Sequence, residues 1–253
     1  VQTALLEVDP QLVLTVLQRL PEDDAGRRGA ARFLFRHKVL NGMSAATAGP
    51  LAVRLADFVL RTGRNEDKPT VLEYIAGLPG ADAANLLKDI ATGKRTYAYA
   101  VPYDRSAINL EEPGLRFSAV LWLAKRGDPA ARGLVSTLGG QKPYGPDQAA
   151  LALATVLLDP KQPITPAIFK YRSRTLGIAA VDALRQRNES SLTVDALQAA
   201  CRHTDREVAR RGALLAQEHG LAPATEEGTA AADFEIDPGL ASENPTLAVK
   251  EYT

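Results

Sequence analysis

The sequence predicts an all-α fold of stacked antiparallel helical hairpins, followed by an extended acidic C-terminal tail. Three observations lead to this prediction. Apolar residues recur at helical spacing in one segment after another, proline and glycine mark the expected helix ends, and acidic residues gather after residue 221. Only the short stretch Tyr97–Tyr99–Val101 alternates as a strand does.

Eleven helices are expected from these patterns. They cover residues 10–20, 22–40, 50–62, 69–77, 81–92, 112–126, 129–139, 146–158, 165–187 (in one or two pieces), 192–202 and 205–219. Four of them show their apolar face most clearly, through Val13, Val16, Leu17 and Leu20; Leu51, Leu55, Phe58 and Val59; Ala83, Leu86, Leu87 and Ile90; and Ala150, Leu153, Val156 and Leu157.

Helix boundaries are marked by capping residues, prolines and glycines. Several helices are expected to start where a potential capping residue precedes a first-turn proline, at Asp9-Pro10, Glu112-Pro113, Asp128-Pro129 and Thr165-Pro166. The run from Thr204 to Glu207 has the spacing of a capping box. Glycines at 63, 80, 127, 140 and 220 fall where helices should end. The tripeptide Arg126-Gly127-Asp128 therefore reads as a structural turn between helices.

The segment 112–126 is apolar on nearly every side, with Leu115, Phe117, Val120, Leu121, Trp122 and Leu123. A helix of this kind is covered by several neighbours, so we expect it at the centre of the fold. Trp122 should then belong to the core. Short connections make most successive helices antiparallel.

A weak internal repeat accompanies these helices. The segments EDDAGRRGAARFL (22–34) and DREVARRGALLAQ (205–217) both place an acid ahead of Arg-Gly-Ala, and 111–123 and 128–138 are looser versions. The pattern resembles the second helix of HEAT repeats, best at 205–219 and 22–40. The resemblance implies a right-handed α-solenoid of the HEAT and armadillo kind, in which an aspartate caps the turn and an arginine helps to join units. The connector at 93–111 departs from it.

Composition restricts the classes of function. The 253 residues include 30 basic and 30 acidic ones, so the chain as a whole is not drawn to nucleic acid by charge. No apolar run approaches the roughly 18 residues of a membrane span. The single cysteine, Cys201, rules out an internal disulfide and suits a reducing compartment. We expect a cytoplasmic protein, although the chain starts at Val1 and leaves a removed leader open.

The connector 93–111 carries the most distinctive side chains. Two interpretations are open: a platform on which a nucleic-acid strand stacks, or a connector tied down by aromatic anchors that contacts protein. We favour the second. The residues concerned are Lys94, Arg95, Tyr97, Tyr99, Tyr103 and Arg105.

Further basic clusters lie at 27–38, at Lys170, Arg172 and Arg174, and at Arg202, Arg206, Arg210 and Arg211. They could line one concave surface that attracts phosphate, but the matched acids favour solvated faces and ion pairs between units. Chemistry-bearing sets are scarce. Cys201, His203 and Asp205 point to different sides if they are helical, and no metal-ligand spacing or phosphate loop is present, so we predict no metal, cofactor or catalytic residue.

The tail is the second distinctive feature. It carries seven acidic residues against one basic residue after Leu221, a net charge of −6, so the neutral total leaves about +6 on the rest. Its spaced apolar residues include Phe234, Ile236 and Leu240, which suit an extended peptide docked in a groove. Its carboxylates could pair with Lys94, Arg95 and Arg105 or with the cluster at Arg202–Arg211.

These features predict a single helical domain over 1–220, followed by an extended acidic tail over 221–253. The predicted function is a non-enzymatic interaction or assembly subunit that binds protein partners, or its own copy, through the helical surface and the tail. The alternative is a HEAT-like nucleic-acid-binding protein or DNA glycosylase-like enzyme, which would use a basic concave surface and the Tyr97–Tyr103 loop. No catalytic carboxylate can be assigned by motif for that alternative.

Overall fold

The computed structural model describes residues 45–62, 67–98, 112–159, 161–186 and 191–221, together with positions 15 and 19. Every regular secondary-structure element within these ranges is a helix, which confirms the all-α prediction. The helices are α4 (Ala45–Thr62), α5 (Lys68–Gly77), α6 (Ala81–Thr92), α7 (Leu115–Lys125), α8 (Ala130–Gly139), α9 (Gly145–Leu158), the 3-10 helix η3 (Pro166–Lys170), α10 (Arg174–Arg185), α11 (Ser191–Cys201) and α12 (Arg206–Glu218). Apart from positions 15 and 19, which are helical, the helices expected at 10–20 and 22–40 lie outside the described residues, as do most of the tyrosine connector and the tail after Leu221.

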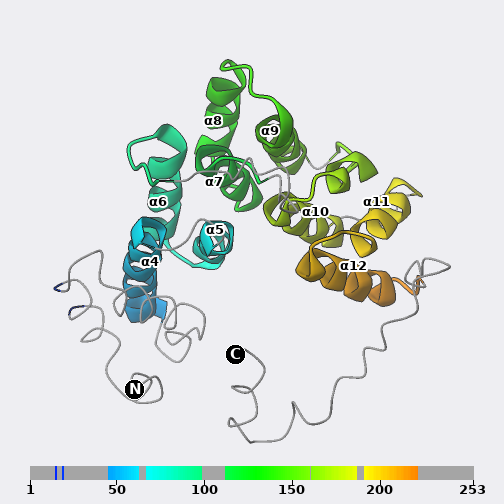
Figure 1. Ribbon diagram of the computed structural model, residues 1–253, viewed down its shortest axis with the longest axis horizontal. Helices are drawn as coiled ribbons and strands as arrows, with labels where there is room; N and C mark the ends of the chain where they lie inside the picture. The colour runs from blue at the N-terminus through cyan, green and yellow to red at the C-terminus, as the bar shows by residue number, and fades with distance from the viewer. Residues whose placement is uncertain are drawn as a thin grey trace, which may run out of the picture.

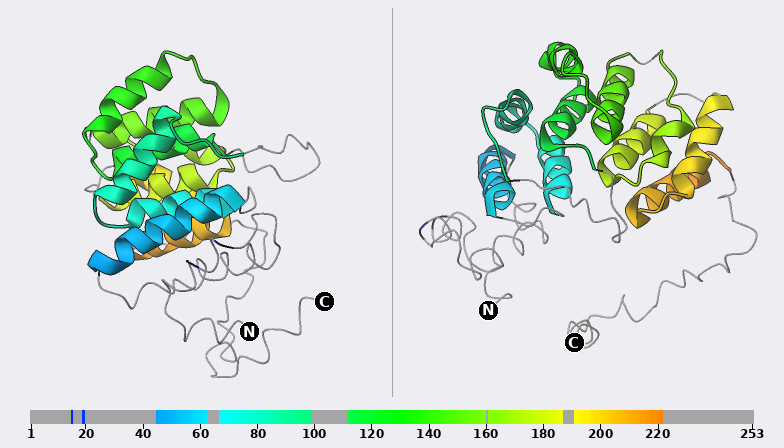
Figure 2. Two further views of the ribbon diagram at one scale, coloured as in Figure 1. Left: turned by 90° about the vertical axis from the view of Figure 1, so that its left-hand side faces the viewer. Right: turned by 45° about the horizontal axis from the view of Figure 1, so that its top comes forward.

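The helices follow one another along an arch from α4 to α12 (Figure 1). In that view α5, α10 and α12 lie on its inner side, and α6, α8, α9 and α11 lie on its outer side. Figure 2 shows many of the helices side by side in successive layers. One continuous cluster of buried apolar side chains runs from α4 to α12, so the layers share a core.

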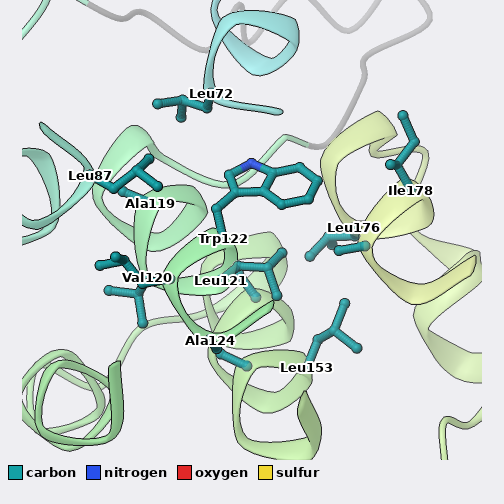
Figure 3. Close-up of a cluster of buried hydrophobic side chains, with 14 of the residues drawn as sticks. Leu72, Leu87, Ala119, Val120, Leu121, Trp122, Ala124, Leu153, Leu176 and Ile178 are labelled. Atoms are coloured by element: carbon teal, nitrogen blue, oxygen red, sulfur yellow. The ribbon is translucent and has the colours of Figure 1, made fainter. Parts of the chain in front are cut away.

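Helix α7 is the centre of that core, as its apolar circumference predicts. Its neighbours include α5, α6, α8, α9 and α10. Trp122 is fully buried between Leu72 of α5 and Leu176 and Ile178 of α10 (Figure 3). The indole therefore fills the junction of three helices and belongs to the core.

Most predicted apolar faces are the buried ones. Ala83, Leu86, Leu87 and Ile90 of α6 are all buried, because the 3.6-residue period puts them on one side of the helix. Helix α6 ends at Gly93, whose φ of 79° is the left-handed conformation that glycine adopts without strain. The segment 165–187 forms two pieces, η3 and α10, because Ser173 begins a new helix by accepting a hydrogen bond from the Leu176 N–H.

Two predicted helix starts are wrong. Helix α4 begins at Ala45 and contains Pro50, which was expected to start it. Helix α7 begins at Leu115 after Gly114, so Glu112-Pro113 precedes the helix and does not open it. In both cases the proline lies at a position that a helix tolerates, but the residue at which the helix begins depends on the surrounding contacts.

The Arg126-Gly127-Asp128 turn is structural. The Arg126 guanidinium donates to the carbonyl oxygens of Ala76 (2.7 Å) and Leu78 (2.6 Å), at the C-terminal end of α5. Asp128 accepts from the Ala130 N–H at 2.9 Å and pairs with Lys88 at 3.0 Å. The turn thereby satisfies the free backbone groups of two helix ends.

Candidate interaction site

The start of the tyrosine connector is anchored to the helical body. The Tyr97 hydroxyl donates to Asp57 Oδ1 of α4 at 2.5 Å, and Arg95 Nη1 donates to the same oxygen at 2.8 Å. Arg61 pairs with the second Asp57 oxygen at 3.2 Å. The Tyr97 ring is half-buried against the core. Asp57 thus collects a phenol and two guanidinium groups at one carboxylate.

This geometry supports the connector interpretation at Tyr97. Burial raises the pKa of the Tyr97 phenol above its usual range, and the hydrogen bond to Asp57 raises it further, so the hydroxyl stays protonated as a donor. Arg95 is occupied by Asp57 and also lies 3.7 Å from Asp89. Lys94 is exposed. Tyr99, Tyr103 and Arg105 lie outside the described residues.

Lys68, which sequence reasoning missed, holds the next residue of the connector. Its ammonium group donates to the Ala98 carbonyl, and the residue is only 2% exposed. Burial lowers the pKa of the Lys68 amine. A lysine at the first position of a helix ordinarily signals a solvated end, so nothing in the sequence marked it.

A network of charges joins the inner helices of the arch. Arg211 of α12 reaches three carboxylates: Glu73 of α5 at 2.7 Å, Asp182 of α10 at 3.5 Å and Glu207 of α12 at 2.8 Å. Lys125 of α7 pairs with Asp182 and lies 5.0 Å from the Trp122 ring centroid. Arg211 is therefore a junction between helices that are far apart in sequence.

The same network continues to the start of α12. Arg174 of α10 lies 3.5 Å from Glu73 and 3.6 Å from Asp205. Arg210 forms two hydrogen bonds of 2.9 Å with Glu207. These bonds are the main cause that lowers the Glu207 pKa to about 2. Arg206 is exposed and has no ion-pair partner among the described residues. Arg174 and Arg211 thus form ion pairs that join different helices.

The cluster Cys201, His203 and Asp205 builds a turn. The Asp205 N–H donates to His203 Nδ1 at 3.0 Å, which leaves the ring proton on Nε2, where it is donated to the Tyr171 carbonyl at 2.9 Å. Burial raises the pKa of the Cys201 thiol. Both imidazole nitrogens are thus engaged by backbone groups.

The predicted capping box at 204–207 is wrong in detail. Asp205, not Thr204, caps α12, accepting from the Glu207 and Val208 N–H groups at 3.0 and 3.1 Å. The Glu207 carboxylate turns to Arg210 and Arg211. Arg210 holds both carboxylate oxygens and Arg211 shares one of them, and such bonds between two charged groups are stronger than a bond to a backbone N–H.

Glu112 was expected to cap the helix that follows it, but the structure places it at another helix. It is 6% exposed, and its carboxylate accepts from Ser173 Oγ (2.9 Å), the Arg174 N–H (2.6 Å) and the Thr175 N–H (3.3 Å). Burial raises its pKa, against the opposing effect of these bonds. Glu112 therefore caps α10, sixty residues onward, and ties the residue that follows the tyrosine connector to that helix.

The comparisons with known proteins leave the family open. No family model matches the chain, and no match was found among curated proteins or solved structures. Of the helices in the described ranges, none has the length and apolar character to cross a bilayer. The same ranges contain no group of three or more histidine, cysteine, aspartate or glutamate residues placed to hold a metal ion.

Proposed function

We propose that this chain is a non-enzymatic interaction or assembly subunit, built as an α-solenoid-like stack of helical hairpins with the acidic tail as a docking segment. The observation that supports the proposal most strongly is that several arginines form ion pairs with carboxylates of the same chain. Arg95, Arg174, Arg210 and Arg211, which a phosphate-binding surface would need, are each paired with carboxylates of the helices. Their charge stabilises the stack instead of attracting an external polyanion.

The shape of the molecule is the second support. An arch with an inner and an outer row of helices exposes a long surface relative to its core (Figure 1), as helical repeat proteins do when they bind other proteins. The tail adds spaced apolar anchors, Phe234, Ile236 and Leu240, among carboxylates. Segments of this kind bind grooves of folded domains in extended form.

The test separates protein binding from nucleic-acid binding. Full-length protein is titrated with a fluorescent duplex DNA at physiological salt, and in parallel the native protein is isolated under gentle conditions and cross-linked before mass spectrometry. We expect weak, steeply salt-dependent DNA binding and a defined protein partner or self-association. Sub-micromolar DNA binding that Tyr97→Ala reduces would overturn the proposal.

A further inference from the structure

Two exposed basic pairs that are distant in sequence meet at one corner of the arch. The corner is formed by the loop between η3 and α10 and by the turn between α11 and α12. Three contacts join them: His203 Nε2 to the Tyr171 carbonyl at 2.9 Å, Arg174 to Asp205 at 3.6 Å, and the Phe169 and His203 rings with centroids 6.4 Å apart. Lys170 and Arg172 flank one side of these contacts, and Arg202 and Arg206 flank the other.

These four side chains, which we call the basic corner, differ from the other arginines of the network. All four are exposed, and none makes an ion pair or side-chain hydrogen bond within the part of the chain that the structure describes. Asp205, which lies next to Arg206 in the chain, is already engaged by Arg174 and by two N–H groups of α12. The positive charge of the corner is therefore uncompensated within the described residues, whereas Arg95, Arg210 and Arg211 are each paired with a carboxylate.

We infer that the basic corner receives the acidic tail of the same molecule. The tail carries seven acidic residues and one basic residue, and it begins directly after Leu221. This inference rests on the proposed function, because it names the place on the body where the docking segment binds. Of the two receptors open from the sequence, the inference takes the one beside α12, because Arg95 at the connector is already paired with Asp57 and the corner is not paired within the described residues.

The geometry of the chain allows this docking within one molecule. From Leu221 back to Arg206 is 15 residues, which at a rise of about 1.5 Å per residue is about 22 Å. An extended chain covers that distance in about seven residues at about 3.3 Å each. Residue 228 is therefore the first that can come level with Arg206, just after Glu226 and Glu227, and Asp233, Glu235 and Asp237 have enough chain to reach Lys170 and Arg172.

Zero-length carbodiimide cross-linking of the full chain tests the inference, because it joins a lysine amine only to a carboxylate in direct contact. We expect Lys170 to link to tail carboxylates between residues 226 and 237. Exposed Lys94, Lys142 and Lys161 serve as reference amines on the same molecule. Raising the salt to about 0.5 M shortens the screening length to a few ångströms and should reduce the Lys170 links at least about fivefold.

Two double variants with the same change in net charge show whether the Lys170 links depend on the basic corner or only on the total charge. Arg172→Glu/Arg206→Glu should reduce the Lys170 links at least about fivefold, since an exposed pair contributes up to roughly that factor and two are reversed. Arg132→Glu/Lys142→Glu changes the net charge by the same amount on α8 and the α8–α9 turn and should leave the Lys170 links unchanged. Circular dichroism shows that both variants retain their helices before the links are compared.

Three outcomes would overturn the inference: links spread evenly over the reference lysines, links equally abundant in both double variants, or links between isotope-labelled and unlabelled copies in a mixture. The last would place the tail on a second copy, so the docking within one molecule fails while the proposed assembly function stands. Loss of the Lys170 links on adding duplex DNA at physiological salt would assign the corner to nucleic acid instead.

Discussion

Replacing Gly177 with alanine should push α10 and α12 apart. A Cβ atom at position 177 would lie 2.6 Å from Cγ2 and 2.7 Å from Cγ1 of Val208, whereas carbon atoms normally approach to about 3.5–4.0 Å. Val208 is fully buried and sits in a helix, where a β-branched side chain keeps essentially one rotamer. Its two methyl groups cannot turn away, so the helices must move.

The size of the effect follows from two opposing contributions. Overpacking of this kind costs about 1–3 kcal/mol, and obstruction by both methyl groups places Gly177→Ala near 3. The better helix propensity of alanine returns about 1 kcal/mol. We expect a net loss of about 2 kcal/mol in the free energy of unfolding, which for a chain of this size lowers Tm by about 4–8 °C.

Urea denaturation followed by circular dichroism measures the loss. Gly133→Ala in α8 is the matched control: the added Cβ meets no atom within 4 Å, so this variant should gain up to about 1 kcal/mol. In Gly177→Ala/Val208→Ala the closest remaining contact is to Val208 Cβ at 3.3 Å, so the double variant should lose less than the sum of the single losses. A Gly177→Ala protein as stable as the wild type, or strictly additive losses, would refute the reasoning.

Three further outcomes follow from the contacts described above. Glu112→Ala leaves the first amides of α10 unsatisfied and should cost about 2–4 kcal/mol in urea denaturation, while Glu112→Gln keeps an acceptor and should cost less than half of that. The Glu207 pKa is depressed to about 2, so its ion pairs stabilise the fold above the ordinary pKa of 4.5 and are lost as the pH falls from 4.5 towards 2; Glu207→Gln should flatten that part of the stability profile. Tyr97→Phe removes the bond to Asp57 and should cost about 1 kcal/mol without changing DNA binding.

Each of these three predictions can be contradicted by a specific result. The raised Glu112 pKa means that the wild type should lose stability relative to Glu112→Gln as the pH rises above 4.5, the opposite direction to Glu207. An unchanged stability of Glu112→Ala would contradict the capping role. Parallel pH profiles of wild type and Glu207→Gln below pH 4.5 would contradict the depressed pKa, and weaker DNA binding by Tyr97→Phe would revive the stacking platform.

Helices and their buried faces were predictable because they depend on neighbours three and four residues away. The face of α6 and the central place of α7 with Trp122 could be read directly from the apolar pattern. The start of α7 could not be predicted in this way, because the Glu112 carboxylate accepts hydrogen bonds from the start of α10 and does not cap α7. Which helix end a carboxylate caps depends on the approach of elements that are remote in sequence.

The candidate site was predictable only in composition. The sequence showed clusters of arginines, but it did not show which were neutralised: Glu73 lies 138 residues from Arg211, and no local pattern links the two. The same tertiary pairing that removes Arg211 from the set of free charges leaves Arg206 in it. Arg95 and Tyr97 are two of the residues named from the sequence for the connector, but their shared partner Asp57 belongs to another helix and no local pattern points to it.

The bond between Arg211 and Glu73 has a consequence for how the molecule unfolds. In a simple stack each helical pair contacts only its neighbours, so the ends can melt while the middle persists. Here one guanidinium connects α12 with α5, and its second partner lies on α10 between them. Fraying of α12 therefore removes the guanidinium partner of carboxylates on α5 and α10 at once, so the loss of α12 also destabilises helices earlier in the arch. Such coupling favours a single cooperative transition over melting from the ends.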